Sequence, residues 1–126
     1  QDVRIANRTV DRARDLARDF AKLGDVSACR FDELGGQHFD LVINATSAGL
    51  HGEVPPVPQA ICGPGTVCYD LAYAMTDTPF VAWARRHGSP KSYQGWGMLV
   101  EQAAEAFLIW RGVRPDTQAV REKLPD

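Results

Sequence analysis

The sequence predicts an α/β protein built on a parallel β-sheet with helices on both faces. Apolar strand-like runs alternate with helix-like runs along the chain, which is the pattern of such sheets. The run over residues 39–46 has a continuous apolar centre, as expected of a parallel strand buried on both faces. The 126 residues, 44% hydrophobic and 24% charged, suffice for one domain with its own core.

The first part of the chain predicts a strand, a helix and a second strand. Residues 3–6 form the first strand, and residues 27–31 form the second. Between them, residues 11–23 form a helix that Gly24 is expected to end. One apolar face recurs along this helix with a period of 3.6 residues, at Ala13, Leu16, Ala17, Phe20 and Leu23. A single helical turn at residues 32–34 follows.

The rest of the chain predicts three more strands and three more helices. Four prolines between residues 51 and 65 exclude a long helix there, although residues 59–61 can form one turn. Thr78 caps a helix that has Pro79 at its first position and continues to His87. Strands are expected at residues 39–46, 66–71 and within 89–93, and further helices at 97–111 and 116–123.

Polar residues gather where the first strand ends. Asn7, Arg8, Thr9 and Arg12 stand at its carboxyl end, where α/β sheets bind ligands. A guanidinium group at this place binds the 2′-phosphate of NADP, whereas an acid there binds the 2′-hydroxyl of NAD. The arginines therefore predict NADP. The alternative is that Asn7 or Thr9 only caps the helix and that the arginines are solvated.

Composition and charge narrow the classes of function. The formal net charge is −2 and the arginines are spread out, which argues against a nucleic-acid partner. No apolar run approaches the roughly 20 residues that span a bilayer. The cysteines (Cys29, Cys62 and Cys68) are odd in number and form no Cys-x-x-Cys pair, and the three histidines lie far apart. We therefore expect no disulfide framework, no metal site and a reducing, cytoplasmic compartment.

The start of the sequence suggests a longer protein. The chain begins with Gln1-Asp2 rather than methionine, and the first predicted strand starts almost at once. We expect a fragment of a longer chain.

Five short motifs occur in series. They are Asn7-Arg8-Thr9-x-x-Arg12, Asn44-Ala45-Thr46-Ser47-Ala48-Gly49, Tyr69-Asp70-x-x-Tyr73, Thr78-Pro79-Phe80 and Gly95-x-Gly97-Met98-Leu99-Val100-x-Gln102-Ala103. With these motifs the chain resembles the carboxy-terminal, NADP-binding domain of shikimate dehydrogenases, from Val3 to about Leu124. The resemblance implies that residues 1–126 form part of a Rossmann-like, doubly wound parallel sheet that lacks its first strand and ends in helices.

The resemblance implies a cofactor site with two halves. The residues Asn7, Arg8, Thr9 and Arg12 match the clamp on the 2′-phosphate, with Arg8 also against the adenine. The loop Asn44, Ala45, Thr46 and Ser47 matches the support of the nicotinamide half. Close to the nicotinamide, Leu71 and Met98 match apolar contacts and Gly95 matches a glycine whose carbonyl faces the amide.

The resemblance also implies two substrate contacts, Tyr73 and, on the following helix, Gln102. Each of these residues has a plainer interpretation. Tyr73 could be an interface aromatic and Gln102 a solvated helix residue. In the same way, Thr46 and Ser47 could be ordinary turn residues, Met98 could be core, and Gly95 could be a loop glycine.

The chain departs from the family pattern at two positions and lacks several parts. Gln94 stands where the family usually has aspartate, and Trp96 stands where a smaller aliphatic residue is usual. The Gly-Ala-Gly-Gly-Ala phosphate loop is absent, as are the catalytic lysine and aspartate of the amino-terminal substrate domain. We therefore expect no catalytic residue in this chain, which should be inactive by itself and should partner that amino-terminal domain.

The activity that the resemblance implies is the reversible, NADPH-dependent reduction of 3-dehydroshikimate to shikimate, in aromatic amino-acid biosynthesis. The alternatives are a quinate/shikimate dehydrogenase paralogue and a non-catalytic interaction module of the same fold. Removing a central strand from the order 3-2-1-4-5-6 leaves two sheet edges that must be paired or covered. Such edges favour association between copies, so a homo-oligomer is a further expectation.

Overall fold

The structure, a computed structural model, describes residues 2–124. The chain divides into two compact units. Residues 2–38 and 56–61 form the first unit, and residues 39–55 and 62–124 form the second.

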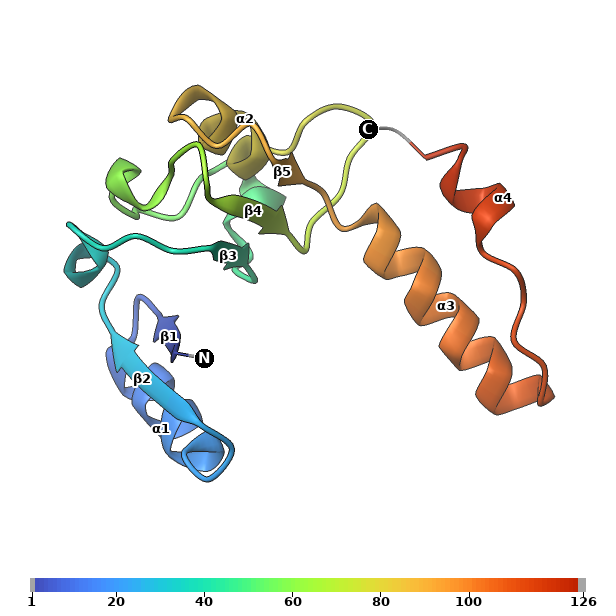
Figure 1. Ribbon diagram of the computed structural model, residues 1–126, viewed down its shortest axis with the longest axis horizontal. Coiled ribbons are helices and arrows are strands. Elements are labelled where there is room, and N and C mark those ends of the chain that lie inside the picture. Colours follow the sequence, from blue (N-terminus) through green and yellow to red (C-terminus); the bar gives the residue numbers. More distant parts are fainter. Residues whose placement is uncertain (1, 125–126) are drawn as a thin grey trace. The chain divides into compact units, whose positions relative to one another are not determined.

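The first unit is a strand–helix–strand motif. Strands β1 (Asp2–Ala6) and β2 (Asp25–Cys29) pair in parallel, with Asp2 opposite Asp25 and Ala6 opposite Cys29. Helix α1 (Val10–Phe20) connects them and packs against both strands (Figure 1). The helix buries the small residues Ala13 and Ala17, which allow a close approach to the strands. This motif confirms the predicted β-α-β start of the chain.

Helix α1 is shorter at its end than the sequence predicts. It stops at Phe20 rather than at Leu23, and the chain then tightens into a turn in which the Leu23 amide donates to the Phe20 carbonyl at 2.9 Å. Gly24 is not among the glycines with positive φ, so it does not end the helix in the left-handed conformation. The early turn lets β2 begin at Asp25, two residues before the predicted start.

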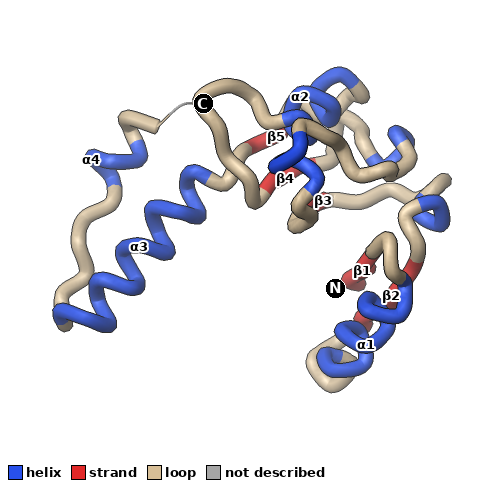
Figure 2. Tube along the Cα trace, turned by 180° about the vertical axis from the view of Figure 1, so that it is seen from behind, coloured by secondary structure: helices blue, strands red, loops and turns tan. Residues whose placement is uncertain are grey.

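The second unit holds a three-stranded parallel sheet. Its strands are β3 (Leu41–Asn44), β4 (Val67–Asp70) and β5 (Ser92–Tyr93), in the order β3-β4-β5 (Figure 2). Helix α2 (Pro79–Arg86) packs on β4 and β5. Cys68 of β4 forms the core with Phe80 and Ala84 of α2.

Both ends of α2 are fixed by their sequence. The Thr78 hydroxyl accepts a hydrogen bond from the Val81 amide at 3.3 Å, and Pro79 occupies the first turn, as predicted. At the other end, Gly88 has a φ of 96°, which a residue with a side chain rarely adopts. Arg85 ties the helix to the sheet, because its guanidinium donates to Asp77 at 2.7 Å and to the Ser92 carbonyl at 3.1 Å.

Two helices complete the second unit. Helix α3 (Trp96–Arg111) ends at Gly112, which has a φ of 71°. Helix α4 (Gln118–Arg121) is only four residues long, shorter than the predicted 116–123. Glu101 of α3 accepts hydrogen bonds from Arg114 at 3.1 Å and from Thr117 at 2.8 Å, and so holds the connection to α4.

The predicted α/β class and the parallel pairing of the strands are confirmed, but the strands do not form one continuous sheet. The described residues contain a two-stranded sheet and a three-stranded sheet. Within residues 2–124 the edge strands are β1 and β2 in the first sheet and β3 and β5 in the second. That a missing central strand would pair with β1 and β3 stays a prediction.

The prediction that residues 39–46 are buried on both faces is wrong. Leu41 and Ile43 of β3 are 53% and 55% exposed, and their neighbour Asn44 is buried. Alternate residues of a strand point to opposite faces, so a helix layer on one face of the sheet leaves the other face open. Helix α2 provides the only such layer seen on this sheet among the described elements that pack closely.

Candidate functional site

The carboxyl end of β1 carries the first predicted group of site residues. The Asn7 side-chain oxygen accepts from the Thr9 amide at 2.9 Å, which forms a tight turn directly after the strand. Thr9 occupies the N-cap position of α1 but its side chain makes no capping hydrogen bond. The turn therefore places Arg8 at its tip and Arg12 in the first turn of α1.

The charge at this strand end is positive. Arg8 and Arg12 are exposed, and neither forms an ion pair within residues 2–124. The nearby acid Asp11 is already paired with Arg14 at 3.0 Å. Two guanidinium groups are thus available to an anion at the place where an α/β sheet binds ligands.

A third arginine stands at the carboxyl end of the same sheet. Arg30 follows β2 directly, and Cys29 of β2 lies opposite Ala6, so Arg30 leaves the sheet next to Asn7. Its guanidinium donates to Asp32 at 3.0 Å, and this hydrogen bond lowers the pKa of the Asp32 carboxyl. Arg30 is therefore partly neutralised, unlike Arg8 and Arg12.

The second predicted group lies at the carboxyl ends of β3 and β4 in the other unit. A buried hydrogen-bond network connects these strand ends. The Asn44 side-chain amide donates to Asp70 at 3.0 Å, and its oxygen accepts from the Thr46 hydroxyl at 2.8 Å. Asp70 also accepts from the Thr78 hydroxyl at 2.6 Å. The network thus fixes the loop after β3 relative to β4 and the start of α2.

Asp70 is the centre of this network and is fully buried. Its two oxygens accept from the Asn44 amide, the Ala72 backbone amide at 3.2 Å and the Thr78 hydroxyl. A buried carboxylate is stable only when its oxygens are hydrogen-bonded in this way. Its oxygens are already occupied by these donors, so Asp70 shapes the strand ends rather than taking a proton from a substrate.

The loop after β3 leaves the sheet with its residues exposed. Ala45, Thr46 and Ser47 are all exposed, and Thr46 also accepts from the Ala48 amide at 3.4 Å. A short 3-10 turn, Ala48–His51, follows. Thr46 therefore stabilises the turn after β3, and its position at a strand end is also the position that a cofactor-binding loop requires.

Gly95 belongs to a tight contact and is not an ordinary loop glycine. A Cβ at this position would stand 2.9 Å from the Leu71 carbonyl carbon and closer still to its oxygen. The Gly95 amide also donates to the Ala72 carbonyl at 2.9 Å. Only glycine allows the backbone before α3 to approach the end of β4 so closely.

The structure brings Leu71, Gly95 and the first turn of α3 together at this contact. Leu71 is 36% exposed beside Gly95, and the Met98 amide in the first turn of α3 donates to the Tyr69 hydroxyl at 3.3 Å. The Tyr73 ring packs on Trp96 with the ring centres 4.5 Å apart. Gln102 is exposed on α3, one turn beyond Met98, and its side chain forms no hydrogen bond within the described part of the chain.

Comparisons with known proteins show which proteins this chain is similar to. The family model described as "Shikimate 5'-dehydrogenase C-terminal domain" matches residues 95–124. A relative from Methylococcus capsulatus, named shikimate dehydrogenase (NADP(+)), is 58% identical over 120 residues, which are 95% of this chain and 43% of the relative. The chain resembles the C-terminal domain of shikimate dehydrogenases. It spans less than half the length of such relatives.

Solved structures show the same likeness. An Ael1 enzyme from Pseudomonas putida is 45% identical, with a TM-score of 0.88 over 99% of this chain and 46% of that protein. A shikimate dehydrogenase solved in complex with NADP+ is 31% identical, with a TM-score of 0.76 over 99% of this chain and 47% of that protein. The fold is therefore the Rossmann-like fold of the shikimate dehydrogenases.

Three residues that shape the site were not predicted as site residues. Asp70 and Thr78 hold the strand ends of the second unit, and Tyr69 accepts a hydrogen bond from the start of α3. A polar residue at the end of an apolar strand was a usable signal for Asp70. The contact of Tyr69 depends on where α3 begins in space, which no local pattern in the sequence reveals.

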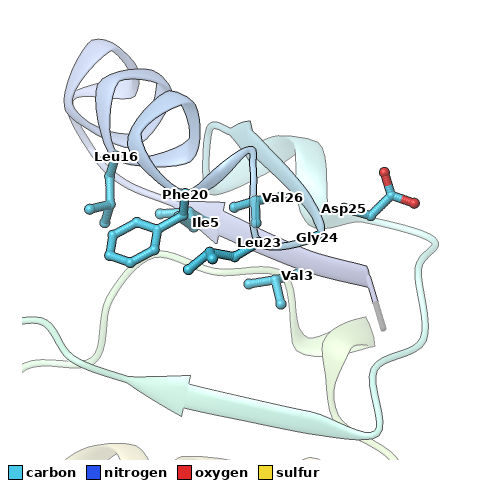
Figure 3. A pocket seen from close by; sticks show the side chains of 8 residues that line it. All are labelled: Val3, Ile5, Leu16, Phe20, Leu23, Gly24, Asp25 and Val26. Carbon is cyan, nitrogen blue, oxygen red and sulfur yellow. The ribbon is translucent and has the colours of Figure 1, made fainter.

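An apolar hollow lies in the first unit, lined by residues other than those of the predicted 2′-phosphate site. Its volume is about 370 Å³. Figure 3 shows the side chains that line it, which come from α1, β1, β2 and the turn before β2. None of the predicted site residues lines this hollow, and its lining is mostly apolar. This lining offers no positive charge to a phosphate, and it exposes apolar side chains of the first unit.

Cys62 lies against the apolar core and is not an activated thiol. Cys62 packs against the core of the second unit near Cys68. Burial, with Cys68 as a neighbour, raises the pKa of the Cys62 thiol to about 11. The thiol form therefore predominates at neutral pH, which makes Cys62 a poor nucleophile.

Within residues 2–124, no three side chains of His, Cys, Asp or Glu come together in a way that could hold a metal ion. None of the helices in that range has the length and apolar character needed to cross a membrane.

Proposed function

We propose that this chain is the NADP-binding part of a dehydrogenase that interconverts shikimate and 3-dehydroshikimate. The observation that carries the proposal is the pair of exposed arginines, Arg8 and Arg12, at the carboxyl end of β1, where Asp11 is already paired with Arg14. Relatives at 54–58% identity are named shikimate dehydrogenase (NADP(+)), which supports both the cofactor and the substrate.

The two groups of residues have different roles in this proposal. Arg8 and Arg12, with Asn7 and Thr9, hold the adenosine 2′-phosphate, because guanidinium groups bind phosphate through two parallel hydrogen bonds. The loop Asn44 to Ser47, together with Leu71, Gly95 and Met98, holds the nicotinamide half. Bound NADP supplies the hydride chemistry. Both groups then belong to one partial NADP-binding domain over residues 1–126.

In this proposal, the side chains of Tyr73 and Gln102 contact the substrate. Neither side chain forms a hydrogen bond within the described residues, so both polar groups are available. The Asp70 carboxylate does not suit proton transfer, since its oxygens are occupied by donors. The lysine and aspartate of an amino-terminal substrate domain would handle the proton at the reacting oxygen.

Helix α3 supports the proposed partnership with such a domain. Among its residues only Ala104 is buried, whereas Ile109 and Trp110 are each 80% exposed. Exposed apolar side chains of this size are typical of surfaces that another domain or copy covers. A homo-oligomer and a cytoplasmic location remain predictions from the sequence.

The proposal is tested with the protein as its gene encodes it, after its intact mass has been measured. A polypeptide of 13.9 kDa is expected to be inactive alone, whereas one of about twice this mass is expected to reduce NADP+ with shikimate. Quinate and NAD+ serve as competing substrates in the same assay. Faster turnover with quinate and NAD+ would favour the paralogue, and no turnover by the longer protein would contradict the proposed activity.

The cofactor assignment has its own test, which works for either length. Arg8→Ala is expected to weaken binding of adenosine 2′,5′-bisphosphate by about 10- to 100-fold, the loss typical of hydrogen bonds to a charged group. Binding of AMP, which lacks the 2′-phosphate, should not change. Arg18→Ala removes an arginine of the same helix that is paired with Asp15 rather than with Asp11, and it should leave both affinities unaltered. Equal effects of the two substitutions would contradict the assignment.

A further inference from the structure

The segment before α3 holds the segment after β4 through three hydrogen bonds. The Gln94 side-chain oxygen accepts from the Ala74 amide at 2.9 Å, and the Trp96 indole N–H donates to the Ala74 carbonyl at 3.1 Å. Between these two residues, the Gly95 amide donates to the Ala72 carbonyl at 2.9 Å. We call this arrangement the 94–96 clamp. Tyr73 lies between Ala72 and Ala74, the two residues to which these hydrogen bonds are made.

Trp96 also contacts Tyr73 directly. The two ring centres are 4.5 Å apart with an angle of 45° between the ring planes. Tyr73 remains 44% exposed, and its hydroxyl forms no hydrogen bond within residues 2–124. The backbone and the ring of Tyr73 are therefore fixed, whereas its hydroxyl is free for another molecule.

Gln94 and Trp96 are the two positions at which the sequence departs from the family pattern. An aspartate in place of Gln94 has a side chain that is one methylene shorter, and an aliphatic residue in place of Trp96 has no N–H to donate. Both hydrogen bonds to Ala74 therefore depend on these two side chains. Gln94 is only 8% exposed, so its carbonyl oxygen needs the Ala74 amide as a partner.

We propose that Gln94 and Trp96 are positioning residues. They hold the Tyr73 hydroxyl in place for shikimate and so set the affinity of the protein for this substrate. This inference rests on the proposed function, because it takes Tyr73 as a substrate contact. The two residues act through Tyr73 and the backbone of Ala74, so they affect the substrate and leave the 2′-phosphate site unchanged.

Two substitutions remove one hydrogen bond each and leave part of the original side-chain packing in place. Trp96→Phe retains an aromatic ring against Tyr73 but has no indole N–H, and Gln94→Leu has a similar volume but no acceptor. Trp83→Phe is the matched control, since Trp83 packs on Phe80 and His87 instead. All three variants are made in the protein as its gene encodes it.

Two measurements are made on each variant. The first is the hydrogen–deuterium exchange rate of the Ala74 amide, which does not depend on activity. It should rise about tenfold in Gln94→Leu, because its acceptor is lost, and should stay unchanged in Trp83→Phe. The second is steady-state kinetics, in which the KM for shikimate should rise about fivefold in both clamp variants while the KM for NADP+ stays within about twofold.

The outcomes separate this inference from the proposed function. A rise in the KM for shikimate together with faster exchange at Ala74 supports the clamp and its role. Unchanged exchange in Gln94→Leu would refute the clamp, and faster exchange with an unchanged KM for shikimate would refute its effect on the substrate. The kinetics are measured on a protein of about twice 13.9 kDa, and absence of turnover by that unsubstituted protein would overturn the proposed function and the substrate role. The exchange measurement still decides whether the 94–96 clamp exists.

Discussion

Replacing Thr78 by valine should destabilise the second unit by about 3 kcal/mol. The substitution keeps the shape of the side chain and removes its hydroxyl, which makes two hydrogen bonds. The bond to the Asp70 carboxylate, at 2.6 Å, is of the charged kind that contributes about 1.5–3 kcal/mol. The bond from the Val81 amide, at 3.3 Å, caps α2 and contributes about 1 kcal/mol. Thr78, Val81 and Asp70 are all buried, so water cannot replace either bond.

The assay is urea denaturation followed by tryptophan fluorescence and by circular dichroism. With a slope of about 1.5 kcal/mol/M, a loss of about 3 kcal/mol lowers the midpoint by about 2 M urea. Thr78→Ser is the matched control, because it keeps the hydroxyl and loses only a methyl group, which is worth about 0.8 kcal/mol. If the valine and serine variants unfold at the same urea concentration, the reasoning about the Asp70 network is refuted.

Two more predictions concern a glycine and a cysteine. Gly95→Ala should destabilise the second unit by about 1–3 kcal/mol, because its Cβ would collide with the Leu71 carbonyl. Gly97→Ala is the control, since its Cβ meets nothing within 4 Å, and it should be neutral or slightly stabilising. Thermal melting of both variants measures the difference. Cys62 should react with iodoacetamide about tenfold faster per pH unit between pH 8 and 10, since its pKa is raised to about 11. Because the unfolded thiol loses its proton near pH 9.0 and the folded one only near 11, the free energy of unfolding should fall as pH rises through this range, and Cys62→Ala should reduce that fall. Equal melting temperatures of Gly95→Ala and Gly97→Ala would contradict the first expectation. A labelling rate of Cys62 that does not depend on pH would contradict the second.

The order of elements was predictable because each one carries a local signal. The 3.6-residue period marks α1, and Thr78 with Pro79 marks the start of α2, which begins where predicted. Boundaries were less well predicted where the chain tightens gradually, as after Phe20. A local pattern shows that a helix exists but does not fix the residue at which its last turn changes type.

Burial was the harder part to predict. The apolar run that contains Leu41 and Ile43 suggested a strand covered on both faces, and both residues are about half exposed. Whether a face is covered depends on elements elsewhere, and hydrophobicity alone does not supply that information. The same holds for the site: Arg8 and Arg12 follow from their place after a strand, but the contacts of Gln94 and Trp96 with Ala74 connect residues about 20 apart.

The network around Asp70 has a consequence for how this sequence can vary. Asn44, Asp70 and Thr78 come from three elements, and each gives or receives a hydrogen bond that the other two cannot replace. A single change at any of them leaves a buried donor or acceptor without a partner, whereas a simultaneous change to apolar residues of similar shape need not. Among relatives, these three positions should therefore either stay constant or change together, while the exposed neighbours Ala45 and Ser47 are free of this constraint.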